Sequence, residues 1–246
     1  MHRTSNTILL TRPQQESQDL AKKLTKIGYQ CLIHPLLTIQ PCPLEQKEFD
    51  AYIITSRQAL HALKALQVPV NTPLFCVGAE TAKEAKKAGF QTYYTGKTVS
   101  DMLSFFAAPN TTYLQYNFLY ARSDTISHDL TTLLRKTGYT IAEQIAYEAV
   151  ATKTLSPEII ELLQQDAFAY VAFFSKRTAQ IFLHLLRQHR IPLSFLKTDL
   201  IAFSRPIAHV LRPVTFKKRH ILRAPTLSSF MKRMHILASP ESQLIK

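Results

Sequence analysis

The sequence contains no tryptophan and has only five glycines and three cysteines in 246 residues. So few glycines form neither a Walker loop nor a GxGxxG turn, so no nucleotide-dependent reaction is expected. The number of cysteines is odd, and Cys31, Cys42 and Cys76 have no CxxC spacing. We therefore expect reduced thiols. A nucleophile elbow, a helix-turn-helix and an RNA-recognition signature are also missing, so the prediction of a nucleic-acid partner rests on charge alone.

The chain also lacks a long hydrophobic run. No apolar stretch approaches the roughly 20 residues that cross a bilayer, and the first residues show no signal-peptide pattern, so we expect a cytoplasmic protein with no membrane partner. Nine histidines are scattered along the sequence. His184 and His189 are five positions apart and do not share a helix face as an i, i+4 metal pair would, so no metal is expected.

Acidic residues are scarce: 17 of them oppose 30 Lys and Arg, for a net charge of +13. The excess is uneven, because residues 200–246 contain nine Lys or Arg but only one acid, Glu241. Such a surplus favours an anionic partner. A nucleic acid, an acidic membrane surface and a polycarboxylate metabolite all remain open, as does an ordinary solvated basic surface.

What the sequence does contain is an internal repeat. Four pairs of segments match in the same order: 8–29 with 118–139, 52–56 with 171–175, 75–90 with 201–216, and 98–100 with 226–228. Each block runs from about four to six apolar residues through a polar loop into a segment with helical apolar spacing, which is a βα pattern. Strands that are apolar on both faces suit a parallel sheet covered on both sides. We therefore predict two doubly wound parallel α/β lobes.

The loops that follow these strands carry the residues suited to bind anions. Ligands of parallel α/β folds lie beyond the carboxyl ends of the strands, where helix N-termini offer unpaired N–H groups. The loops are Thr11-Arg12-Pro13, Thr55-Ser56-Arg57, Gly78-Ala79-Glu80-Thr81, Arg122-Ser123-Asp124, Ser175-Lys176-Arg177 and Ser204-Arg205-Pro206. Each hydroxyl alone is an ordinary helix cap. Their recurrence with arginine indicates a site for carboxylates or phosphates.

These segments, in this order, resemble the uroporphyrinogen-III synthase family. The resemblance runs from Leu9 to about Met234 and rests on these motifs: LLTRP at 9–13, DAYIITS at 50–56, FCVGxxTA at 75–82, AYE at 146–148 and FFS at 173–175. It implies two flavodoxin-like lobes joined by two strand-like linkers, with the active site in the cleft between the lobes. The repeat alone would divide the chain near residue 110. The resemblance instead implies one discontinuous domain, 1–36 plus 152–246, and an inserted domain, 40–148.

The resemblance also implies a reaction. A member of this family is a lyase of heme biosynthesis that cyclises hydroxymethylbilane, with loss of water and inversion of ring D, and needs no cofactor. The eight carboxylates of this substrate would explain the basic loops. We expect a monomer, and a transient contact with hydroxymethylbilane synthase is left open. Two alternatives remain: a silent paralogue that binds a tetrapyrrole or another polyanion, and a nucleic-acid-binding protein.

Tyr147 matches the tyrosine that the family places beside the leaving hydroxyl, so the resemblance implies that it is the proton donor. The alternative reading is a tyrosine that anchors a strand between the lobes through its hydroxyl. The resemblance assigns substrate contacts to Arg12, Ser56, Thr81 and Ser175, with Gly78 allowing close approach of the backbone.

The sequence departs from the family at Ser204-Arg205-Pro206-Ile207. The family usually has glycine-proline-threonine-threonine in this loop. We expect Arg205 and Arg122 to compensate, because they keep charge close to the same loops, and we count Ser204, Arg205 and Arg122 among the substrate-binding residues.

Overall fold

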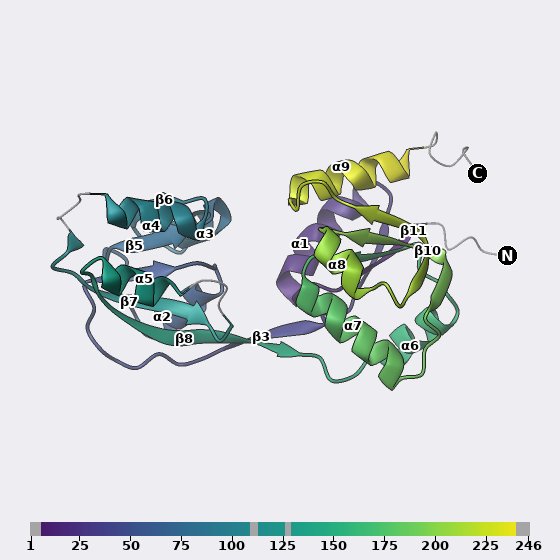
Figure 1. Cartoon of the computed structure of the whole chain (residues 1–246), viewed down its shortest axis with the longest axis horizontal. Coiled ribbons are helices and arrows are strands. Elements are labelled where there is room, and N and C mark those ends of the chain that lie inside the picture. The colour runs from purple at the N-terminus through teal and green to yellow at the C-terminus, as the bar shows by residue number, and fades with distance from the viewer. Residues whose placement is uncertain (1–5, 109–112, 126–128, 240–246) are drawn as a thin grey trace. The chain divides into compact units, whose positions relative to one another are not determined.

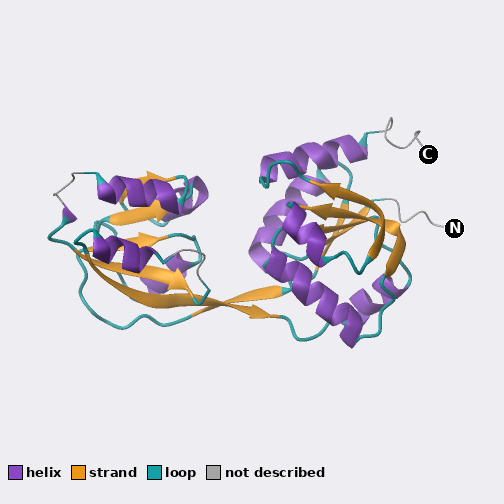
Figure 2. Ribbon diagram, viewed as in Figure 1, coloured by secondary structure: helices purple, strands orange, loops and turns teal. Residues whose placement is uncertain are grey.

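The computed structural model describes residues 6–108, 113–125 and 129–239. The chain divides into two compact units, which we call unit 1 (1–38 with 151–246) and unit 2 (39–150) (Figure 1). In each unit helices flank a mainly parallel sheet, as Figure 2 shows. The predicted fold class is therefore confirmed. A boundary near residue 110, which the repeat alone suggests, is wrong, because that position lies inside unit 2.

Unit 1 has the strand order of flavodoxin-like proteins. Its elements are β1 (Thr7–Leu10), α1 (Gln14–Thr25), β2 (Gln30–Ile33), α6 (Pro157–Gln164), β9 (Tyr170–Phe173), α7 (Lys176–Gln188), β10 (Ser194–Ala202), α8 (Arg205–Val210), β11 (Thr215–Ile221) and α9 (Leu227–Ala238). The order across the sheet is β2-β1-β9-β10-β11, with parallel pairing at each step. In chain order this is 2-1-3-4-5, and the direction of winding reverses between β1 and β9.

Unit 2 contains the same five-strand arrangement in a different chain order, with a sixth strand added at one edge. Its elements are β3 (Leu37–Pro41), β4 (Ala51–Ile54), α2 (Ala59–Ala65), β5 (Leu74–Val77), α3 (Ala79–Lys87), β6 (Thr92–Gly96), α4 (Val99–Ala107), β7 (Asn117–Ser123), α5 (Leu130–Lys136) and β8 (Thr140–Ala151). The sheet runs β3-β8-β7-β4-β5-β6, and the winding reverses between β7 and β4. The neighbouring strands β3 and β8 carry the two connections between the units.

The sequence repeat is visible in these two orders. Strands β1 and β2 correspond to β7 and β8, and strands β9, β10 and β11 correspond to β4, β5 and β6. Each unit therefore combines the first part of one repeat with the second part of the other.

Local sequence explains the elements well. All four residues of β4 and of β5 are buried, as uninterrupted apolar runs require in a sheet covered on both faces. Thr98 caps α4 by accepting the N–H of Asp101, and Thr226 caps α9 by accepting the N–H of Ser229. These two threonines occupy matching positions in the repeat, and both are helix N-caps.

The core of unit 2 lies on the two faces of its sheet. One cluster packs the sheet against α2 and α3, and the other packs it against α4 and α5. Phe75 is fully buried in the second cluster, with the rings of Tyr113 and Phe106 at 5.2 and 5.4 Å between centroids. Unit 1 has a single connected core, in which the Tyr29 hydroxyl joins the connection between α1 and β2 to α9 by donating to the carbonyl of Met234 (2.9 Å).

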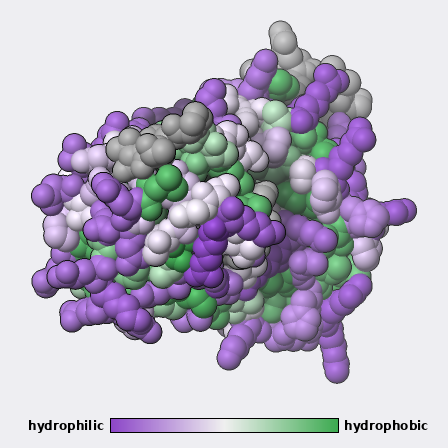
Figure 3. Space-filling view, turned by 60° about the vertical axis from the view of Figure 1, so that its left-hand side comes forward, coloured by the Kyte–Doolittle hydropathy of each residue, from purple (hydrophilic) through white to green (hydrophobic). Residues whose placement is uncertain are grey.

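The three cysteines are free, as predicted. Burial raises the pKa of the Cys76 thiol to about 12 and that of Cys31 to about 11. Within the described ranges, no helix has both the length and the apolar character to span a membrane. Hydrophilic side chains project over much of the face in Figure 3, with apolar side chains between them.

Candidate functional site

The predicted contact residues lie at the carboxyl edges of the two sheets. In unit 1, Arg12 follows β1, Ser175 follows β9 and Ser204 follows β10. In unit 2, Ser56 follows β4, Gly78 follows β5 and Arg122 is near the end of β7. In each unit, two of the loops meet where the winding reverses, between β1 and β9 and between β4 and β7. This is the position at which ligands of open parallel sheets bind.

Arg12 is held in place before any ligand arrives. Its Nε donates to Glu16 Oε2 at 2.8 Å, and the guanidinium lies over the Phe174 ring at 4.7 Å from the centroid. The side chain of Arg12 keeps 23% exposure. The hydroxyl of Thr11 donates to the carbonyl of Ala172 (3.0 Å) and so joins the loop after β1 to strand β9. A cation oriented in this way can bind a carboxylate at small entropic cost.

The two predicted contact serines of unit 1 differ in whether their hydroxyls cap the helix that follows. The Oγ of Ser175 accepts the N–H of Thr178 (3.1 Å), so Ser175 is the N-cap of α7. Ser204 begins α8 without a hydrogen bond from its side chain to the helix. Arg205 is exposed and forms no ion pair with any residue in the described ranges. The altered loop therefore presents a hydroxyl that does not cap its helix and a cation without an ion pair in the described part of the chain.

The unit 2 loops combine hydroxyls with a tight backbone turn. Gly78 has φ +89°, a conformation that strains residues with a side chain, and its N–H donates to the carbonyl of Gly96 (2.8 Å). Thr81, one turn into α3, is buried. The Oγ of Ser56 accepts the N–H of Gln58 (3.3 Å). The Thr55 and Tyr120 hydroxyls lie 3.2 Å apart where the winding reverses, and burial raises the pKa of Tyr120.

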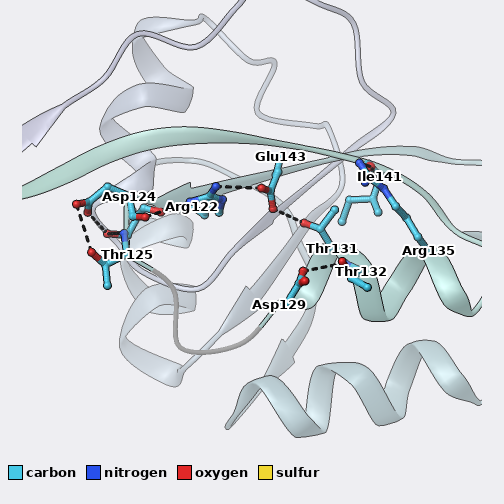
Figure 4. A network of polar contacts seen from close by, with 10 residues as sticks. Arg122, Asp124, Thr125, Asp129, Thr131, Thr132, Arg135, Ile141 and Glu143 are labelled. Carbon is cyan, nitrogen blue, oxygen red and sulfur yellow. Dashed lines mark hydrogen bonds and ion pairs between the residues drawn. The ribbon is translucent and has the colours of Figure 1, made fainter.

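The guanidinium of Arg122 forms hydrogen bonds within unit 2. Its Nη2 donates to Glu143 Oε1 (2.9 Å) and its Nη1 to the carbonyl of Ser123 (2.8 Å), while the buried Nε has no partner among the described residues. The Thr131 hydroxyl donates to the other oxygen of Glu143 (2.7 Å), and Figure 4 shows the resulting chain from β7 through β8 to α5. Its role in substrate binding therefore stays a prediction, and its observed contacts serve the structure.

Tyr147 lies in β8, 9% exposed, packed with the cluster that faces α2 and α3. Its carbonyl accepts the N–H of Asp124 (3.1 Å). Its hydroxyl forms no hydrogen bond with any described residue, so nothing observed there supports the alternative in which this hydroxyl anchors a strand. A phenol without an internal partner is available to donate to a ligand.

Two residues at the edge of unit 1 were missed by sequence reasoning. Phe174, the ring beneath Arg12, was noted only as part of a motif. His34 directly follows β2, and its Nε2 is buried without a partner among the described residues. Burial lowers the pKa of His34 and so favours the neutral ring. Its place after a strand is a signal that could have identified it.

A separate groove of about 690 Å³ lies at the other end of the unit 2 sheet. Its lining includes Asp50, which precedes β4, and Asn117, which begins β7. None of the predicted site residues lines it. No group of three or more His, Cys, Asp or Glu residues suited to a metal ion occurs in the described part of the chain.

Fold and loops together define a flavodoxin-like α/β protein of two units, with hydroxyl- and arginine-bearing loops at its carboxyl edges. The family model described as uroporphyrinogen-III synthase HemD matches residues 18–232. The chain therefore belongs to the uroporphyrinogen-III synthase family, and the resemblance noted in the sequence is confirmed.

Individual relatives are distant. Porphyrin biosynthesis protein HemD of Ruminiclostridium josui is 22% identical over 206 residues, which are 77% of this chain and 40% of that protein. The chain thus spans less than half the length of that relative. The crystal structure of uroporphyrinogen-III synthetase from Helicobacter pylori is 20% identical, with a TM-score of 0.63 over 94% of this chain and 99% of that one.

A mutant uroporphyrinogen III synthase from Thermus thermophilus is 16% identical, with a TM-score of 0.51 over 95% of this chain and 98% of that one. At these identities the solved structures support the fold, and family membership rests on the family model.

Proposed function

We propose that this chain is a uroporphyrinogen-III synthase, a lyase that closes hydroxymethylbilane into uroporphyrinogen III with loss of water and inversion of ring D. The observation that carries the proposal is that the family match spans residues 18–232 and includes eight of the nine predicted site residues, all except Arg12. Arg12 precedes the residues that match. We include it as a substrate-binding residue because it follows β1 and because Glu16 orients its guanidinium.

In this mechanism the substrate loses its hydroxyl group as water. Tyr147 donates a proton to that oxygen, the carbon–oxygen bond breaks, and the electron-rich pyrrole stabilises the cation that remains. To invert ring D, this cation bonds first to the α-carbon of ring D that already carries the bridge to ring C, and the older carbon–carbon bond to that bridge breaks. The released bridge carbon then bonds to the free α-carbon of ring D, which loses its proton as the pyrrole regains its aromaticity. The chain's own contribution is to hold the substrate folded with its ends together and to supply the acid.

The carboxyl-edge loops supply the contacts for substrate carboxylates. Arg12 and Arg205 offer cations, Ser56, Ser175, Ser204 and Thr81 offer hydroxyls, and Gly78 lets the backbone approach. Hydrogen bonds to a charged carboxylate are stronger than neutral ones, about 1.5–3 kcal/mol each. No cofactor enters any of these steps. A monomeric enzyme in the cytoplasm, and a transient contact with hydroxymethylbilane synthase, remain predictions.

The test is a coupled assay in which freshly generated hydroxymethylbilane is supplied and the oxidised type I and type III uroporphyrins are separated by chromatography. We expect the type III isomer to dominate. Only type I, the product of unassisted closure, would contradict the proposal and favour the silent paralogue. Retention on DNA that persists at physiological salt would instead favour the nucleic-acid alternative, because non-specific phosphate binding weakens steeply with salt.

Arg205→Ala tests whether the altered loop contacts substrate. Because the side chain is exposed and unpaired among the described residues, its removal should raise KM for hydroxymethylbilane about tenfold, the loss of one charged hydrogen bond, and leave kcat nearly unchanged. Arg212→Ala is the matched control, since Arg212 is also exposed but lies past the other end of α8. An unchanged KM in Arg205→Ala would remove Arg205 from the site.

A further inference from the structure

Strand β8 is irregular opposite the carboxyl end of β7. Arg122 pairs with Ile145, but the next residue, Ser123, pairs with Tyr147, so β8 contains one extra residue at this point. Side chains alternate between the two faces of a regular strand, and a bulge breaks that alternation. Accordingly the consecutive residues Ala146 and Tyr147 are buried in the same cluster, the one that faces α2 and α3. The bulge thus decides to which face of the sheet Tyr147 points.

Asp124 contacts β8 at two points immediately after the bulge. Its N–H donates to the Tyr147 carbonyl at 3.1 Å, and its Oδ1 accepts the N–H of Ala149 at 3.4 Å. One residue therefore holds β8 in its shifted register just beyond the bulge, with both its main chain and its side chain. These two contacts fix the main chain immediately before and after Glu148.

The carboxylate of Asp124 is itself held firmly. The Ser123 hydroxyl donates to Oδ1 at 2.9 Å and the Thr125 hydroxyl to Oδ2 at 3.3 Å. Burial raises the pKa of the Asp124 carboxyl, but these hydrogen bonds and those from the backbone lower it more, so the group is ionised near neutral pH. Beneath this turn, the Arg122 guanidinium donates to the carbonyls of Ser123 and Asp124 and is anchored by Glu143 (Figure 4).

We propose that Asp124 is a positioning residue for Tyr147: it closes the bulge in β8 and so holds the phenol on the face from which it gives its proton. The inference deepens the proposed function and rests on it for the catalytic role of Tyr147. Asp124 itself acts through the backbone of β8, without contact with the reacting atoms. Catalytic groups need placement to within about 0.5 Å, and a displacement of about 1 Å can cost about 100-fold in rate.

The kinetic test is a double-mutant cycle on the coupled assay. Asp124→Ala should lower kcat by about 10- to 100-fold with little change in KM, whereas Asp124→Asn, which keeps an oxygen for the Ala149 N–H, should recover most of the rate. In a Tyr147→Phe background the Asp124→Ala change should cost nothing further, because the group that it positions is gone. Equal losses in both backgrounds would overturn the proposal.

The position of the Tyr147 ring can also be followed by ¹⁹F NMR, independently of enzyme activity. Tyrosines are replaced by 3-fluorotyrosine, and the ¹⁹F signal of Tyr147 is identified by its loss in Tyr147→Phe. Asp124→Ala should shift that signal, while the control Asp101→Ala, which removes a carboxylate that accepts the Thr98 N–H at the start of α4, should not. If the wild type makes no type III product yet the signal moves, the proposed function fails and the positioning geometry stands. An unmoved signal overturns the positioning role.

Discussion

Tyr147→Phe should lower kcat for the type III product about 100-fold, at the lower end of what a general acid contributes. The substitution removes only the hydroxyl, and that hydroxyl has no hydrogen bond to a described residue, so the fold should lose little stability. The remaining activity should come from the loops that hold the substrate and from water as a weaker acid. The coupled isomer assay measures both the rate and an increased share of the type I product.

Tyr139→Phe provides the matched control. The Tyr139 hydroxyl donates to the carbonyl of Phe106 at 3.1 Å, within the cluster that faces α4 and α5. Its loss should cost about 1 kcal/mol of unfolding free energy and leave turnover unchanged. An unchanged rate in Tyr147→Phe, or equal losses in both variants, would show that Tyr147 is not the proton donor.

Phe75→Ala should destabilise unit 2 by about 3–5 kcal/mol. The ring is fully buried on β5, and the rings around it are those of Tyr93, Phe105, Phe106, Tyr113 and Phe118, with centroids 5.2–6.3 Å away. Truncation leaves a cavity that ring neighbours fill poorly, because aromatic packing is rigid. Urea unfolding followed by circular dichroism should show the loss as a lower midpoint.

Tyr93→Ala is the control for this cavity. Tyr93 contacts the same cluster but is 44% exposed on β6, so its truncation opens no buried space and should cost less than about 1 kcal/mol. Similar losses in the two variants would mean that the cluster is not a close-packed core.

Many of the fold's elements could be predicted because local forces decide them. The apolar run at 51–54 is buried on both faces whichever strand lies beside it, so a parallel strand follows from its composition alone. Thr98, Ser175 and Thr226 each accept an N–H three residues later, which is a contact within one turn. The carboxyl-edge loops were predictable for the same reason, since parallel strands carry all their following loops to one edge of a sheet.

Contacts between distant residues could not be predicted in this way. Glu143, the partner of Arg122, lies 21 positions away on the next strand, so no local pattern connects the two charges. The ring of Phe174 lies under Arg12 only because β1 and β9 are neighbours, although 161 residues separate Thr11 from its own acceptor, Ala172, on β9. Nor does composition reveal a bulge, which is a property of the register between two strands.

The sequence by itself determined that the chain is duplicated, that each copy alternates strands with helices, and that polar loops follow the strands. Only the tertiary structure decided how the copies combine: β1 and β2 join β9, β10 and β11, while β7 and β8 join β4, β5 and β6. The copies have the same local pattern, so either set of strands could complete either sheet. The choice depends on the complementarity of whole packed surfaces. In the same way, the pairing of Ser123 with Tyr147 decides which face of the sheet the proposed acid occupies.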